Sequence, residues 1–477
     1  MRILGSVLAL ALPLAAQTIL ITKGAADYQV YQRDSQDKAS IALDGKALVA
    51  DGKSVEARLL KDGFPLSGFD WRPIAKVAKG MWSAKFEQVP TGGPYKLEVR
   101  VSGTADIGSA GHLLVGDLWI LAGQSNMEGV GNLVDLPQPR PTINSFDMTD
   151  QWVEARDPLH RLVDAMDRVH WPRNAQGQPD KYEDSRLQKW MADRRKGAGL
   201  GLPFAIAMTE RNGVPIGLVP CAHGGTSMDQ WSPSLKDKGG DSLYGGMFRR
   251  FRAVGGKVKG VLWYQGESDA NDKAAPLFAE KFKALVASIR SDFNHPDLPF
   301  YYVQIGRHVA GAPGVPWNAV QEAQRLAEDS IPNVGMVTCA DCNLDDGIHV
   351  STPDLLTLGV RLANLASGGT KRGPRPASAR FENGVITVTF RDVNRRLASV
   401  HRVLGFSIVN TGGQPLPLIY HARVHPSQPD AVQIFIQGKP PEGAKLMYGL
   451  GRDPVVNLVD EAGMACPVFG PFPITLP

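Results

Sequence analysis

Five short, nearly continuous apolar runs between residues 111 and 370 constrain the fold of this chain more than any other feature. Amphipathic stretches separate the runs, and Phe278, Phe282, Leu285 and Ile289 fall on one helical face. Apolar strands that alternate with helices are typical of a parallel sheet covered on both faces, so we predict an α/β domain over residues 111–370. The five runs are Leu118–Leu121, Ile216–Val219, Val261–Tyr264, Tyr301–Ile305 and Val334–Val337.

The segments on either side of this domain have a different pattern. Residues 17–110 and 371–477 alternate apolar and polar residues between turn clusters, as in Val385–Phe390. Such alternation is typical of antiparallel strands. We therefore predict an N-terminal β-rich domain over residues 17–110 and a C-terminal β-rich segment over residues 371–477. The C-terminal segment could stand alone or pack with the N-terminal domain.

One connection inside the α/β domain is unusually long. Residues 131–199 lie between the first and second apolar runs, and loops of this length are often functional. We predict that this stretch is a long loop. Its basic run Arg194-Arg195-Lys196 is predicted to be a solvated turn.

Charge and the N-terminus limit where this protein acts. Lys plus Arg number 52 and Asp plus Glu 48, and a net charge of +4 excludes a basic nucleic-acid footprint. Residues 1–16 pair Arg2 with an apolar stretch and end in Ala15-Ala16, which predicts a signal peptide. No later run reaches the ~18 apolar residues of a membrane helix. We therefore expect a secreted or periplasmic protein without a membrane span.

The cysteines suggest neither a disulfide framework nor a metal site. The chain has only 4 cysteines, and Cys339 and Cys342 form one isolated C-x-x-C pair. A single pair of this kind is weak evidence for zinc, so a local disulfide or two free thiols is expected. We predict no metal and no cofactor.

Polar motifs follow the apolar runs, at the edge of a parallel sheet where ligands bind. Ser125 lies at a strand-to-helix turn, where its hydroxyl is exposed and its N–H can face a developing negative charge. His349 could act as its base, and Asp346, three residues earlier, could orient the imidazole. Taken singly, the serine is as easily an N-cap residue and the Asp-x-x-His spacing a chance match.

Donors for an oxyanion follow two other runs. The Gly224-Gly225 pair lets a backbone N–H approach closely, and Gln265 offers a side-chain amide. A tight turn and a loop-bridging glutamine are the alternative interpretations. Together with the N–H of Ser125, these groups would supply three donors from three strand ends.

Four motifs together resemble the SGNH hydrolases, and within them the sialate O-acetylesterase and acetylxylan esterase (carbohydrate esterase family 6) group. The resemblance implies a flavodoxin-like three-layer α/β/α catalytic domain. The motifs are Gly123–Met127, Val219–Ser227, Trp263–Asp269 and Asp346–His349.

The resemblance also implies the roles of the site residues. Ser125 would be the nucleophile, His349 the base and Asp346 the orienter. The N–H of Ser125, a glycine of the pair, with Gly225 favoured, and Gln265 would form the oxyanion hole. The Asp lies three residues before the His, as in the xylan-acting branch, whereas many sialate O-acetylesterases place it two before, where this chain has Gly347.

Substrate contacts are predicted for four residues around these motifs. Gln124 and Asn126 flank the serine, and Trp231 and Glu267 could bind the sugar. The alternatives are an N-cap or strand-bridging role for Gln124 and Asn126, a core position for Trp231 and a loop brace for Glu267. An anionic sugar would require an arginine. The candidates are Arg156, Arg161, Arg168, Arg173 and Arg307.

The function predicted from the sequence is that of an exported serine esterase that removes O-acetyl groups from carbohydrates. A glycan-binding protein without turnover and an esterase of another substrate class are the alternatives. The acetylated sugar and the oligomeric state stay open.

Overall fold

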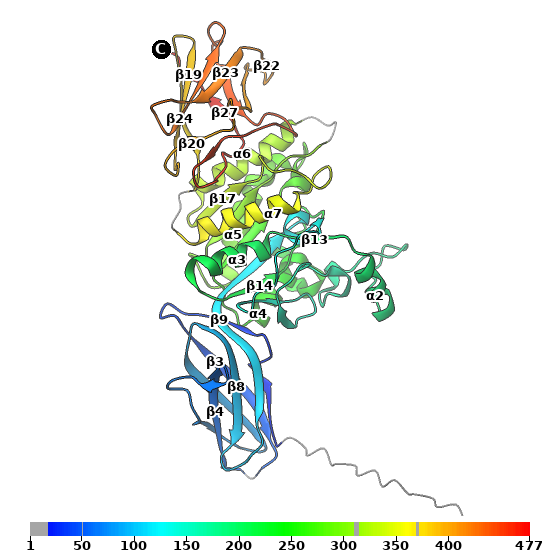
Figure 1. The fold of residues 1–477 in the computed structure, drawn as a ribbon. Coiled ribbons are helices and arrows are strands. Elements are labelled where there is room, and N and C mark those ends of the chain that lie inside the picture. The colour runs from blue at the N-terminus through cyan, green and yellow to red at the C-terminus, as the bar shows by residue number, and fades with distance from the viewer. Residues whose placement is uncertain (1–17, 50, 310–313, 369–371) are drawn as a thin grey trace, which may run out of the picture.

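The computed structural model describes residues 18–49, 51–309, 314–368 and 372–477 (Figure 1). The predicted signal peptide, residues 1–16, lies outside the described residues. Along the long axis of the molecule the N-terminal strands, the α/β region and the C-terminal strands follow one another. Within the described ranges, none of the helices combines the length and the apolar character that crossing a membrane requires.

Six parallel strands form the centre of the large sheet, in the order β11-β14-β9-β15-β16-β17. The predicted parallel α/β arrangement is confirmed. All five apolar runs lie in or directly at the ends of these strands. Those strands are β9 (Gly108–Gly123), β14 (Ile216–Pro220), β15 (Gly260–Tyr264), β16 (Phe300–Gln304) and β17 (Val334–Thr338).

Two strands of the large sheet lie inside the stretch predicted to be a long loop, so that prediction is wrong in part. β11 (Ile143–Phe146) pairs parallel with β14, and β12 (Trp152–Glu154) pairs antiparallel with β11. Both strands are short, and β11 contains the polar residues Asn144 and Ser145. Asn144 is buried because its side chain donates to the carbonyl of Tyr28 at 2.6 Å. The sequence therefore lacks the continuous apolar pattern by which the other strands are recognised.

Helices pack on both faces of the parallel strands. On one face α3 (Gly201–Asn212) meets α7 (Thr352–Ala366), and Gly359 permits this contact because a Cβ there would lie 2.6 Å from the Phe204 nitrogen. On the other face Phe282 of α5 packs against Phe300 and Tyr302. The remaining helices are α1 (Ser125–Glu128), α2 (Asp184–Asp193), α4 (Leu243–Ala253), α5 (Phe278–Asp292) and α6 (Val315–Ser330), and the short 3-10 turns are η1 (Leu162–Asp164), η2 (Arg168–His170), η3 (Pro233–Asp241), η4 (Glu267–Asp269) and η5 (Ala275–Leu277).

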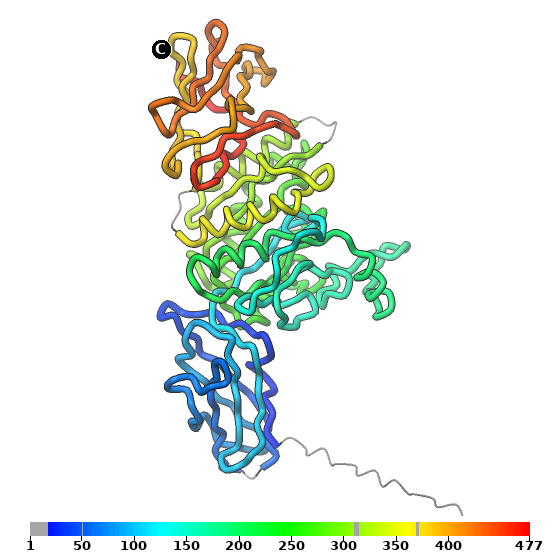
Figure 2. Tube along the Cα trace, in the orientation of Figure 1, coloured from blue at the N-terminus to red at the C-terminus, as the bar shows by residue number. Residues whose placement is uncertain are grey.

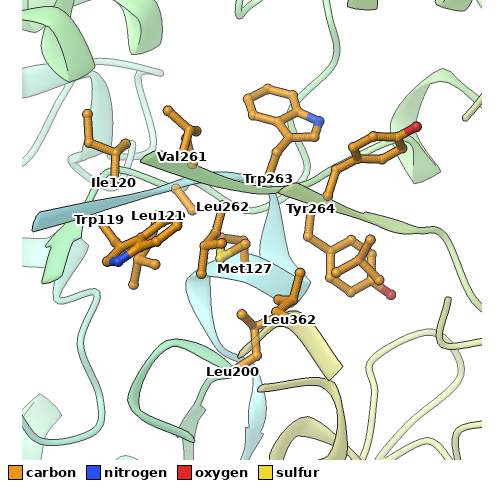
Figure 3. Close-up of a cluster of buried hydrophobic side chains, with 14 of the residues drawn as sticks. Trp119, Ile120, Leu121, Met127, Leu200, Val261, Leu262, Trp263, Tyr264 and Leu362 are labelled. Atoms are coloured by element: carbon orange, nitrogen blue, oxygen red, sulfur yellow. The ribbon is translucent and has the colours of Figure 1, made fainter. Parts of the chain in front are cut away.

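The core holds the start of α1 in place. Figure 3 shows Val261 and Trp263 on one side of the sheet and Met127, Leu200 and Leu362 on the other. All five side chains are buried. Because Met127 lies two residues after Ser125, its packing anchors the turn that carries the serine.

The N-terminal strands join the α/β region without a linker. β9 pairs with β8 (Gly92–Val101) over its first half and with β14 and β15 over its second. The predicted boundary between residues 110 and 111 therefore falls inside one continuous strand. The other strands of this region are β1 (Ile19–Lys23), β2 (Val30–Gln32), β3 (Lys38–Ala47), β4 (Ser54–Lys61), β5 (Phe64–Pro65), β6 (Arg72–Lys76) and β7 (Met81–Pro90).

The C-terminal strands build a separate core at the opposite end of the molecule, so in the described residues the two β-rich segments do not pack together. Their last part returns to the α/β region (Figure 2), where Gln304 bonds both the N–H and the carbonyl of Val468. The strands are β18 (Arg375–Glu382), β19 (Val385–Arg391), β20 (Leu397–Ala398), β21 (Phe406–Val409), β22 (Pro415–Leu416), β23 (Ile419–Val424), β24 (Ala431–Ile436), β25 (Lys445–Tyr448), β26 (Val459–Asp460) and β27 (Phe469–Pro473).

Candidate active site

Ser125 is the first residue of α1 and directly follows the end of β9. Gly123 makes the tight turn there, because it has a φ of +133° and a Cβ would lie 2.1 Å from the Tyr264 carbonyl oxygen. Ser125 is half-buried. Among the residues that the structure describes, its N–H has no hydrogen-bond acceptor. Ser125 thus combines an accessible hydroxyl with a free backbone donor.

His349 and Asp346 face each other within one turn. The Nδ1 atom of His349 lies 2.8 Å from Oδ2 of Asp346. Oδ1 of the same carboxylate accepts the backbone N–H groups of Ile348 and His349, at 3.0 and 2.9 Å. These bonds fix the carboxylate against Nδ1, which assigns the proton of a neutral imidazole to Nδ1 and leaves Nε2 unprotonated. Partial burial acts to raise the pKa of Asp346, but hydrogen bonds from Lys196 and His349 bring it well below its usual value.

Asn126 connects the serine turn to the histidine turn. Its Oδ1 accepts the N–H of Val350 at 3.0 Å, and its Nδ2 donates to the carbonyl of Ile348 at 3.4 Å. The residue beside Ser125 therefore grips the backbone on both sides of His349. This contact places the start of α1 beside the turn that carries Asp346 and His349.

The Gly224-Gly225 turn lies against the serine. A Cβ at Gly224 would be 3.4 Å from the Ser125 Cβ. The N–H of Gly224 is engaged by Oε2 of Glu128 at 2.7 Å. Gly225 is exposed, has a φ of +68°, and its N–H meets no acceptor in the described part of the chain. Of the two glycines, Gly225 therefore has the N–H that is available to an oxyanion.

A family model described as "Carbohydrate esterase, sialic acid-specific acetylesterase" matches residues 115–367, more than half of the 477 residues. The chain belongs to this carbohydrate esterase family. The resemblance to the sialate O-acetylesterase group seen in the sequence is thereby confirmed.

Individual proteins agree with the family assignment. A probable carbohydrate esterase of Arabidopsis thaliana is 30% identical over 272 residues, which cover 52% of this chain and 88% of that protein. The sialate O-acetylesterase of Mus musculus is 21% identical, with 66% of this chain and 70% of the mouse protein covered. A carbohydrate acetylesterase structure from Xanthomonas citri has a TM-score of 0.64 at 24% identity, covering 94% of this chain and 98% of that one. At that identity the structural likeness shows a shared fold.

Gln265, the predicted side-chain donor to the oxyanion, directs its amide toward the protein in this esterase-family chain. Its side chain is fully buried, and Nε2 donates to the Thr226 carbonyl at 3.0 Å and to the Asp269 carboxylate. An amide NH2 group has two N–H bonds, so both are in use. In this conformation Gln265 braces the loop after Gly225, and its role as an oxyanion donor stays a prediction.

The predicted sugar contacts also turn toward the protein. Trp231 is fully buried and packs edge-on against Trp263 at 5.2 Å, so it is a core residue. Gln124 is 3% exposed and accepts the N–H of Ser268. Asn126, also 3% exposed, hydrogen-bonds the backbone of the histidine turn through its side chain. In this structure the three side chains are engaged within the protein, and contact with a substrate stays a prediction.

Glu267, the fourth predicted contact, supports Asn126. Its Oε1 accepts the Asn126 Nδ2 hydrogen at 2.9 Å. Burial raises the pKa of Glu267 to about 7. The carboxyl group therefore acts on the histidine turn through Asn126, as the alternative of a loop brace predicts.

The cysteines are all free and buried in the structure, including Cys339 and Cys342 of the C-x-x-C pair. Burial raises the pKa of the Cys342 thiol well above its usual value. Of the two alternatives left open by the sequence, the structure has free thiols. Within the described ranges no cluster of three or more His, Cys, Asp or Glu side chains could hold a metal ion.

A cavity of about 430 Å³ opens beside the Gly224-Gly225 turn. Much of its wall comes from the long insertion after the first strand, including Trp171, Arg173 and Trp190. On the other wall His223 stacks on His170, with their Nδ1 atoms 3.1 Å apart. Burial, assisted by the charge of Arg173, lowers the pKa of His223 to about 4. Burial also holds the pKa of His170 well below its usual value, so both histidines are neutral at ordinary pH.

Glu128 was not singled out in the sequence, although it lies three residues after the serine. It lines the cavity and holds the glycine turn through the Gly224 N–H. Burial raises its pKa to about 7, against the lowering effects of that N–H and of the charge on Arg194. Only a fold that brings strand ends together gives Glu128 this role, so no local sequence signal marks it.

Substitutions of Glu128 should distinguish two effects of its carboxyl group. One is the hydrogen bond that holds the glycine turn, and the other is the effect of a buried carboxyl group on stability. Glu128→Ala removes the acceptor of the Gly224 N–H, and we expect kcat/KM for an acetyl ester to fall roughly tenfold. Glu128→Gln keeps an acceptor and should retain more activity.

Because the folded-state pKa of Glu128 is raised, the stability that its neutral carboxyl group contributes is lost as the pH rises through 7. Glu128→Gln should therefore raise Tm relative to wild type more at pH 8 than at pH 4.5, as thermal unfolding would show. An equal Tm difference at both pH values would contradict this.

Proposed function

We propose that this protein is an exported serine esterase that hydrolyses O-acetyl esters on carbohydrates through an acetyl-serine intermediate. The observation that carries the proposal is the pair of hydrogen bonds from the Asn126 side chain to the backbone of Ile348 and Val350. They set the turn of Ser125 beside a histidine whose Nδ1 is held by Asp346. We also assign the α/β region to the SGNH-hydrolase type. Membership of the carbohydrate esterase family supports both assignments.

The reaction would proceed in two steps. The Ser125 Oγ attacks the acetyl carbonyl carbon while Nε2 of His349 takes the hydroxyl proton. The N–H groups of Ser125 and Gly225 stabilise the negative charge on the carbonyl oxygen. The sugar alcohol then leaves with the proton from His349. A water molecule, deprotonated by the same histidine, attacks the acetyl-serine carbonyl carbon. The bond to Oγ breaks, Ser125 takes the proton back from His349, and acetate is released.

Acetate release tests this function directly. Wild-type protein should hydrolyse 4-nitrophenyl acetate, and then acetylated xylan or an acetylated sialic acid, with the preferred glycan identifying the substrate branch. A folded protein that binds these glycans but releases no acetate would favour the alternative of a glycan-binding protein. Export is supported by the signal-peptide pattern of residues 1–16, and N-terminal sequencing of the mature protein tests it.

Arg173 supports an anionic substrate. It lines the cavity beside His223 and, in the described residues, has no carboxylate partner. The other four candidate arginines are paired with carboxylates. The pairs are Arg156 with Glu154, Arg161 with Asp164, Arg168 with Asp241 and Arg307 with Asp453. We infer that the guanidinium of Arg173 meets a carboxylate on the acetylated sugar.

A charge-removing substitution separates anionic from neutral substrates. Arg173→Gln should raise KM for 9-O-acetyl sialic acid by roughly tenfold, the loss of one charge-assisted hydrogen bond, and leave acetylated xylan hydrolysis unchanged. Arg168→Gln, in the same insertion but paired with Asp241, is the matched control. Steady-state kinetics on both substrates provides the measurement. An equal rise in KM for the neutral glycan would show that Arg173 does not discriminate between anionic and neutral substrates.

A further inference from the structure

Asp346 has a second basic partner besides the histidine. Lys196 places its Nζ 2.6 Å from Oδ2 of Asp346, the same oxygen that lies 2.8 Å from Nδ1 of His349. Oδ1 is taken by the backbone N–H groups of the turn. In the described part of the chain, Lys196 is the one cationic side chain that makes an ion pair with this carboxylate apart from the histidine itself. The solvated turn predicted for residues 194–196 is therefore wrong at Lys196.

The backbone of Lys196 is fixed to the histidine turn. Lys196 begins β13 (Lys196–Ala198), which pairs with β10 (Gly131–Asn132), and Asn132 lies opposite Lys196. The N–H of Asn132 donates to Asp345 at 2.9 Å, and Thr352 donates its hydroxyl hydrogen to the Asn132 carbonyl at 2.7 Å. The β10–β13 ribbon is thus tied to the segment on both sides of His349. Exposed ion pairs contribute little to stability when both side chains move freely. Here the backbone of Lys196 is held in place relative to the turn that carries Asp346.

The other charged groups near this turn are already engaged. On the turn itself, Asp345 accepts the backbone N–H groups of Asn132 and Thr352. From η4, Glu267 accepts from Asn126. From α1, Glu128 binds the N–H of Gly224. In the loop after β16, the N–H of Val309 donates to the carbonyl of Gly347 in the turn. The charged side chains of that loop contact the C-terminal segment, Arg307 pairing with Asp453 and His308 with Arg452. Lys196 is therefore the positive charge that bears most directly on the Asp346–His349 pair.

We propose that Lys196 is a positioning residue of the catalytic site, which holds Asp346 ionised and in place while its positive charge opposes protonation of His349. The inference rests on the proposed serine esterase function. A cation beside an imidazole disfavours the imidazolium form, so His349 stays an available base at lower pH than it would without Lys196. The insertion that carries Lys196 therefore extends the working range of the site toward acid.

The pH profile separates this role from simple structural support. Lys196→Gln should shift the acid limb of kcat/KM for 4-nitrophenyl acetate to higher pH by about half to one unit. Lys196→Arg keeps the charge and should leave the limb in place. Lys189→Gln, an exposed lysine on α2 of the same insertion, is the matched control. A lower kcat with an unmoved limb in Lys196→Gln, or the same shift in Lys196→Arg, would overturn the proposal.

A second measurement is independent of turnover. The imidazole of His349 can be titrated by NMR and identified as the signal that is missing from His349→Gln. Lys196→Gln should move its titration midpoint to higher pH by a similar amount, and Lys189→Gln should not. If the wild type releases no acetate, the proposed function fails while this titration still decides the role of Lys196. A midpoint that Lys196→Gln leaves unchanged would overturn the inference even in an active esterase.

Discussion

Ser125→Ala is expected to reduce acetate release by roughly 10³-fold or more, because the proposed reaction passes through an ester on this hydroxyl. The backbone of residue 125 would keep its N–H and its place at the start of α1, and the buried Met127 would still anchor the turn. Tm should therefore change little. Ester hydrolysis of wild type and variant, with thermal unfolding of both, measures the effect.

The control for this substitution is Ser227→Ala, in the loop after Gly225. The Ser227 hydroxyl contacts Gln230 at 3.4 Å and has no part in the proposed chemistry, so its removal should leave turnover near the wild-type value. Wild-type turnover in Ser125→Ala would remove the basis for a serine esterase. A comparable loss in Ser227→Ala would mean that the loss in Ser125→Ala is not specific to the proposed nucleophile.

His349→Gln is expected to cause a loss of the same order, roughly 10³-fold, because the serine is then left without a base. Residues that act as a unit are strongly non-additive. The double variant with Ser125→Ala should consequently be no slower than either single variant. Asp346→Asn should cause a smaller loss, since the amide oxygen can still accept from Nδ1 or from the backbone N–H groups that the carboxylate now binds.

Kinetics of the two single variants and of the double variant, on one ester, provide the test. If the two losses multiply in the double variant, the serine and the histidine do not act on one step. In that case the Asn126 contacts would hold a turn that has another role, and His349 would not be the base.

The strands that carry the site were predictable from the sequence because burial on both faces leaves a continuous apolar run. The same reasoning missed β11, where the buried Asn144 donates its side-chain N–H to the Tyr28 carbonyl in the N-terminal region. It also placed a domain boundary inside β9, since an apolar strand looks the same whether or not it passes from one core into the next. Partners distant in the sequence decide both points.

At the site, position along the chain was predictable and side-chain direction was not. Ser125 and the Asp346–His349 turn follow their strands as expected, because parallel strands end at one edge. Gln265 and Trp231 also follow strands, yet both are fully buried and bond within the loop between them. The contacts of Asn126 and Lys196 with the histidine turn join segments far apart in sequence, and no local pattern indicates them.

The most direct test of the central claim is to trap the acetyl group on the protein. Wild-type protein mixed with 4-nitrophenyl acetate, quenched rapidly in acid and digested, should yield the peptide containing Ser125 with one acetyl group added. The same peptide from Ser125→Ala should remain unmodified. Steady release of acetate with no acetyl group on Ser125 at any quench time, or equal labelling of the alanine variant, would contradict the acetyl-serine mechanism.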